Sequence, residues 1–145
     1  CGDLANWGSS LGSFVGKLNS TGDCQWSRAM INIWLTTSSN TYANTIAIAG
    51  TMYNDFAALY ASSYNTGNGT ILMKLSVDDG STVWLRTIPG QVKDELQAVD
   101  TDTNGEIAVA GTFSTSYSID SVPISGTNGV LFAKFTSNGT CLWAN

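Results

Sequence analysis

Hydrophobic and polar residues alternate along this chain in short runs, and two of the runs are nearly identical. "TIAIAGTM" begins at Thr45 and "EIAVAGTF" begins at Glu106, so the same apolar pattern ends twice in Gly-Thr followed by a large apolar residue. Alternation over so few residues is typical of β-strands that bury one face. The matched runs therefore predict a β-strand unit that the chain repeats.

A second pattern pairs an apolar run that contains a lysine with a later tryptophan. The lysines lie in "FVGKL", "ILMKL" and "LFAKF" and are Lys17, Lys74 and Lys134, and the tryptophans are Trp26, Trp84 and Trp143. A glycine turn signal separates each pair, at Gly22, Gly80 and Gly139. The turn signals are Thr21-Gly22, Asp79-Gly80 and Asn138-Gly139, and Asp-Gly and Asn-Gly favour type I′ turns between antiparallel strands. Each lysine strand is therefore predicted to form a hairpin with a tryptophan strand, with the lysine stem packed and its head on a carbonyl or carboxylate.

One complete unit is predicted to hold four strands. In the last unit these are residues 96–101, 107–113, 130–136 and 141–144. We divide the chain into a half unit (1–30) and two full units (31–88 and 89–145). Four antiparallel strands in roughly 60 residues fit a β-propeller blade or a similar repeat. The predicted fold class is all-β, with four-stranded propeller-like blades in an incomplete ring, a fragment or an assembling protomer.

The motifs "AVD…NGEIAVAGT" and "VLFAKFTSNGTCLW" resemble the repeats of the SBBP-type β-propeller family. The resemblance covers residues 14–145. It implies an all-β protein that is extracellular or attached to a cell surface and has no known catalytic site. It transfers no functional residue to this chain.

Composition narrows the function classes. Charged residues make up only 12% of the chain, the net charge is −5 and histidine is absent. Nucleic acid is not an expected partner, because binding phosphates requires clustered Lys and Arg. The lack of histidine removes Ser-His-Asp and Cys-His catalysis and most zinc sites. We expect no enzyme activity, no cofactor and no membrane-spanning helix.

Two and a half units are fewer than the 4–8 blades typical of closed propellers. The half unit would leave an apolar sheet edge without partners, which natural proteins avoid. We therefore expect head-to-tail association, either with other copies or with the remainder of a longer chain. Glycans are a further candidate partner.

Several residues are candidates for modification, bridging or metal binding. The Asn-X-Ser/Thr sequons that predict exposed N-glycosylation sites begin at Asn19, Asn68 and Asn138. "DTDTNGE" resembles the start of a calcium loop, with ligands at Asp100, Asp102 and Asn104. The later carboxylate of such a loop is missing, so a plain Asn-Gly hairpin is favoured over a metal site. The adjacent pairs Asp78-Asp79 and Asp94-Glu95 are interpreted as solvated turns.

The cysteines are Cys1, Cys24 and Cys141, an odd number. An odd count in an oxidising compartment suggests an intermolecular bridge. We favour an internal Cys1–Cys24 bridge, which leaves Cys141 to reach outward. A lipoprotein that begins at Cys1 is the alternative.

The repeated tryptophans are interpreted as core between units. The unrepeated aromatic residues are better ligand candidates, and these are Trp7, Trp34, Tyr60 and Tyr64. Three functions remain open at this stage. The first is a secreted structural protein that self-assembles, the second is a carbohydrate-binding propeller, and the third is a propeller hydrolase whose carboxylates would come from missing blades.

Overall fold

The computed structural model describes residues 12–38, 43–58, 69–90 and 94–145. Every regular element in these ranges is a β-strand, which confirms the all-β prediction. Among these residues no helix has the length and apolar character that crossing a membrane requires.

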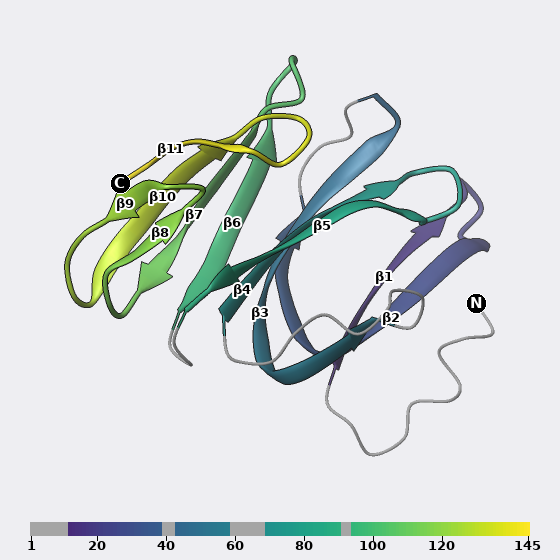
Figure 1. The fold of residues 1–145 in the computed structure, drawn as a ribbon. Coiled ribbons are helices and arrows are strands. Elements are labelled where there is room, and N and C mark those ends of the chain that lie inside the picture. Colours follow the sequence, from purple (N-terminus) through teal and green to yellow (C-terminus); the bar gives the residue numbers. More distant parts are fainter. Residues whose placement is uncertain (1–11, 39–42, 59–68, 91–93) are drawn as a thin grey trace.

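Apart from β8 and β9, the strands follow one another in the order that the hydrophobic pattern predicts. They are β1 (Gly12–Leu18), β2 (Cys24–Ser38), β3 (Thr45–Ala58), β4 (Gly69–Ser76), β5 (Thr82–Pro89), β6 (Glu95–Thr101), β7 (Ile107–Phe113), β8 (Tyr117–Ile119), β9 (Val122–Ile124), β10 (Gly129–Phe135) and β11 (Cys141–Ala144). One antiparallel sheet has the order β1-β2-β3-β4-β5, and a second has the order β11-β10-β7-β6. The second sheet packs beside the first, with β6 against β2, β3 and β4 (Figure 1). Neither sheet closes on itself, as expected for incomplete propeller-like blades.

The lysine–tryptophan hairpins share one register. Lysine lies opposite tryptophan in the pairs β1–β2, β4–β5 and β10–β11, and in each pair the register shifts directly after the lysine. The three hairpins are therefore structural repeats, and this part of the prediction is confirmed. Their equivalent positions follow from this register.

The turns of these hairpins differ from the predicted type I′ geometry. A type I′ turn needs positive φ at both central residues, but here only the glycine has it, with φ of 88° at Gly22, 71° at Gly80 and 87° at Gly139. In the β10–β11 turn, the amide of Gly139 donates to the Thr136 carbonyl oxygen and the amide of Thr136 donates to the Thr140 carbonyl oxygen. This pattern is typical of a longer loop that ends in a left-handed glycine and a bulge.

Two features of the sheets were not anticipated. The expected boundary between residues 30 and 31 falls inside β2, which continues from its pairing with β1 into its pairing with β3. The first hairpin therefore joins the middle unit in one sheet. In addition, β8 and β9 form a small hairpin between β7 and β10 that the sequence interpretation missed.

Two hydrophobic cores flank the middle unit. Met30, Ile33, Ile48, Ile71 and Met73 belong to the core on the β1–β2 side. The other core joins β3, β4 and β5 to the second sheet and contains Ala47, Ala49, Leu72, Leu96, Val109, Leu131 and Phe135. Strand β4 is consequently buried on both faces, and its nearly continuous apolar sequence fits that place. Strand β10, its equivalent in the last unit, buries alternate residues only.

Candidate functional site

Side-chain hydrogen bonds connect each described unit to the next one. Trp26 donates its indole N–H to the Val77 carbonyl oxygen of the next turn at 2.8 Å. Trp84 makes the equivalent bond to the Ser137 carbonyl oxygen at 3.1 Å. Each tryptophan is partly buried between its own unit and the next. The prediction that these tryptophans lie between units is therefore confirmed for Trp26 and Trp84.

A glycine in each receiving turn leaves room for the indole. A Cβ atom built on Gly80 would lie 2.6 Å from the Trp26 ring, and one built on Gly139 would lie 3.3 Å from the Trp84 ring. Both glycines also adopt positive φ, which L-residues with side chains rarely do. The turn glycine thus has two roles, because it shapes the hairpin and receives the tryptophan of the preceding unit.

Two of the three repeated lysines, Lys74 and Lys134, have the kinds of partner that the sequence predicts. Lys74 is buried and donates from Nζ to the Ser137 carbonyl oxygen at 3.2 Å, and this burial lowers its pKa. Lys134 instead forms ion pairs with Glu106 at 2.6 Å and with Asp102 at 3.4 Å. The lysine at the junction, Lys74, is thus hydrogen-bonded to a backbone carbonyl oxygen, whereas Lys134, on the outer strand β10, is paired with carboxylates.

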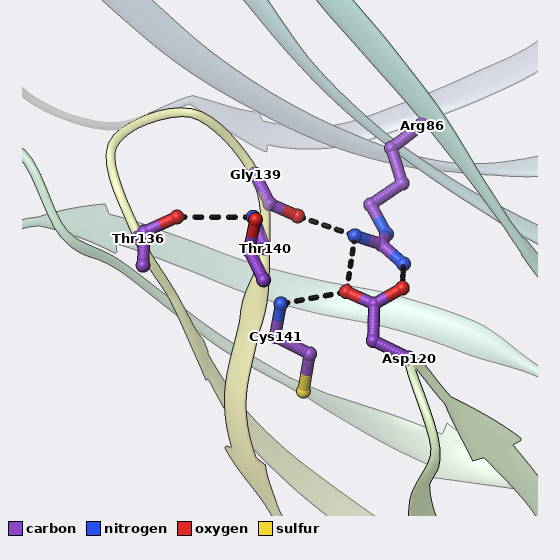
Figure 2. Close-up of polar contacts among 6 residues, drawn as sticks. All are labelled: Arg86, Asp120, Thr136, Gly139, Thr140 and Cys141. Atoms are coloured by element: carbon purple, nitrogen blue, oxygen red, sulfur yellow. Dashed lines mark hydrogen bonds and ion pairs between the residues drawn. The ribbon is translucent and has the colours of Figure 1, made fainter.

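Arg86 clamps the middle unit to the last one, as Figure 2 shows. Its guanidinium forms a bidentate ion pair with Asp120 and also donates to the Gly139 carbonyl oxygen. The Asp120 carboxylate accepts the backbone N–H of Cys141 at 2.8 Å as well. The guanidinium further lies 5.5 Å from the centre of the Phe135 ring, within cation–π range. One carboxylate therefore links strand β5, the β8–β9 hairpin and strand β11.

Asp120 reaches this position because it occupies a tight turn. Ile119 pairs with Val122, and both central residues have positive φ, 49° at Asp120 and 69° at Ser121. That is the type I′ geometry, in which Asp is one of the favoured residues. The hydrogen bonds from Arg86 and from the Cys141 amide lower the pKa of the Asp120 carboxyl. A two-residue Asp-Ser loop between the apolar segments "YSI" and "VPI" is the sequence signal that could have revealed it.

Cys141 lies beside this clamp with a free, buried thiol. Burial, with a smaller effect of the Asp120 charge, raises the pKa of that thiol. A protonated, enclosed thiol is a poor nucleophile, so the cluster resembles a structural clamp more than a reactive centre. The same burial does not favour the outward bridge expected of Cys141. The expected Cys1–Cys24 bridge involves Cys1, which lies outside the described residues.

Two of the calcium-ligand candidates, Asp100 and Asp102, accept hydrogen bonds from nearby backbone amides. Asp102 accepts the backbone N–H groups of Asn104 and Glu106 at 2.9 and 3.0 Å, and Asp100 accepts that of its neighbour Thr101. These bonds form a hairpin turn around Gly105, as the favoured interpretation expects. Within the described ranges no group of three or more His, Cys, Asp or Glu residues could hold a metal ion.

One acidic pair differs from its interpretation as a solvated turn. Asp94 is buried, and its carboxylate accepts the Ser114 amide N–H at 2.7 Å. Burial and the Asp94 charge raise the pKa of Tyr117 to about 12. A backbone amide can satisfy a carboxylate away from water, and the sequence gives no sign of which amide will do so. Asp79, by contrast, lies exposed in its turn as interpreted.

Two of the expected glycosylation sites can be placed. Asn19 and Asn138 are both exposed, in the β1–β2 and β10–β11 turns. The Asn19 side chain accepts the amides of Thr21 and Asp23 and donates to the Asp23 carboxylate. Asn68 lies outside the described residues. The exposure that glycosylation requires is thus present at two sites, while the modification itself stays a prediction.

The ligand candidates are only partly described. Trp34 lies on β2 and is more than half exposed. Trp7, Tyr60 and Tyr64 lie outside the described residues. The structure therefore does not bring an aromatic pocket together from the residues that it describes.

No protein-family model matches the sequence, and no curated protein matches it either. The resemblance to SBBP-type repeats thus stays a prediction, and the site must be interpreted from its own geometry.

Proposed function

We propose that the protein is a secreted structural protein whose propeller-like units associate into a larger assembly, with other copies of itself or with further units of a longer chain. One observation carries the proposal. Trp26 and Trp84 each bind the following unit, whereas their equivalent Trp143 is 48% exposed. A module that binds its neighbours through a repeated contact, and presents that contact again at one end, is suited to assembly.

The polar clusters of the described residues support a structural role over catalysis. Arg86 and Asp120 bind one another and backbone groups, and Lys134 is held by two carboxylates. Extracellular placement and N-glycosylation belong to the same proposal and are supported by exposed sequons at Asn19 and Asn138.

Sedimentation velocity over a range of protein concentrations tests the proposal, with and without reducing agent. We expect a reversible increase in sedimentation coefficient with concentration that survives reduction. A 15.3 kDa monomer at every concentration would refute self-association.

Carbohydrate binding is the second candidate, and the exposed Trp34 favours it. Aromatic side chains at exposed positions offer flat apolar faces with a polar edge, which suits a sugar ring. Binding to a glycan array that is lost in Trp34→Ala and kept in Val83→Ala would support this function. No array signal for the native chain would exclude it.

A further inference from the structure

The last unit exposes a face that the middle unit buries. Val130, Phe132 and Trp143, which we call the tail face, are 60%, 54% and 48% exposed. The equivalents of Val130 and Phe132 are Thr70 and Leu72 on β4, which occupy the same register against β3 and are both buried. Leu72 belongs to the core that joins β4 to the second sheet. The tail face therefore has the composition of a junction, but it lies on the outer side of the last sheet.

The first hairpin carries the opposite half of a junction. Leu18 is 62% exposed although its equivalent Leu75 is fully buried. Among the described residues, a Cβ atom built on Gly22 meets no atom within 4 Å, whereas Gly80 and Gly139 each lie under a tryptophan ring. Gly22 shares their positive φ, so its turn has the form that receives an indole at the other two places. We call Leu18 and the turn of residues 19–23 the head face.

From these two faces we infer that the tail face of one copy docks on the head face of a second copy. The Trp143 indole then lies over Gly22 and donates its N–H to the Ser20 carbonyl oxygen, the equivalent of the Val77 and Ser137 acceptors. This inference deepens the proposed function and rests on it. The contact is head-to-tail, so it closes into a ring or continues into a filament.

A second copy is the occupant that the geometry favours. Each chain carries both halves of the junction, and the middle unit separates them, with β1 and β2 at one end and β10 and β11 at the other (Figure 1). One chain cannot bring its own faces together without breaking its two internal junctions. Between copies, the contact already made by Trp26 and Trp84 is simply made again.

Single substitutions test each face by sedimentation under reducing conditions. The chain is prepared without N-glycans, because Asn19 lies in the same turn as Gly22. Trp143→Ala removes the indole. Gly22→Asn places a side chain where the indole would lie, and asparagine tolerates the positive φ of this position. Each should raise the dissociation constant for self-association by at least about tenfold, as expected for a central interface tryptophan.

Leu142→Ala is the matched control. Leu142 is exposed, and its equivalent Val83 stays exposed beside an intact junction, so this position lies outside the contact. Its dissociation constant should remain within about twofold of the native value.

Mixing the two variants gives the sharpest result. Trp143→Ala keeps its head face and Gly22→Asn keeps its tail face, so the mixture should form a one-to-one complex at a concentration at which each variant alone sediments as a monomer. Complex formation also shows that both variants are folded. If the native chain associates but the variants behave like Leu142→Ala, or if the mixture forms no complex, the inference is overturned while the proposed function stands. A native chain that never associates overturns the inference together with the self-association part of the proposed function.

Discussion

The Arg86–Asp120 clamp yields a prediction whose size follows from its contacts. Asp120→Asn keeps the side-chain shape and the preference for the type I′ turn, but removes the negative charge. The Cys141 amide then donates to a neutral acceptor, which weakens that bond by about 1 kcal/mol. The ion pair is partly exposed, with side-chain exposures of 21% and 34%, so its loss adds only about 0.5 kcal/mol. We expect a decrease in the free energy of unfolding of about 1.5 kcal/mol at pH 7.

The pH dependence of that difference has a definite sign. The pKa of Asp120 is lower in the folded chain than its ordinary value of 3.8. The ionised carboxylate therefore stabilises the fold fully above pH 3.8, and this contribution is lost as the pH falls through the lowered pKa. The native chain and Asp120→Asn should accordingly differ at pH 7 and at pH 5, and should approach equal stability in more acidic solution.

Urea unfolding followed by tryptophan fluorescence measures these differences, in dilute protein that sediments as a monomer. Asp100→Asn is the matched control, because the Asp100 carboxylate accepts the amide of the adjacent Thr101 and lies exposed on β6. Its stability should stay within about 0.5 kcal/mol of the native value. The clamp would be refuted if Asp120→Asn were no less stable than Asp100→Asn, or if its deficit persisted unchanged below the lowered pKa.

Three further predictions concern burial and exposure. Leu72→Ala should lower the free energy of unfolding by about 2–5 kcal/mol, because Leu72 is fully buried. Phe132→Ala, at the equivalent position on the outer face, should change it by less than about 0.5 kcal/mol in dilute protein. Equal effects of the two substitutions in urea unfolding would contradict this difference in burial. The buried Cys141 thiol, with its raised pKa, should react with a thiol reagent at least about tenfold more slowly in the native chain than in urea, and equal rates would show that it is accessible. After secretion from a eukaryotic host, at least one of Asn19, Asn68 and Asn138 should be converted to Asp by endoglycosidase treatment, and peptide maps with three unmodified asparagines would disprove glycosylation.

The hairpins could be predicted because their causes are local. A period of two along each strand and a glycine at each turn are visible in the sequence, and they were sufficient to pair Lys17, Lys74 and Lys134 with their tryptophans. The clamp could not be predicted in the same way. Arg86 and Asp120 are far apart in the sequence, and nothing local indicates that a turn between β8 and β9 will meet strand β5.

By itself the sequence determined the repeat, the lysine–tryptophan hairpins and the order of the strands apart from β8 and β9, since strand pairing across a short turn depends on neighbouring residues. Only the tertiary structure decided which faces are buried. Leu72 and Phe132 occupy equivalent positions in similar apolar runs, yet one is fully buried and the other is more than half exposed. Burial depends on what packs against a strand from another unit, and the spacing of residues within that strand does not encode it.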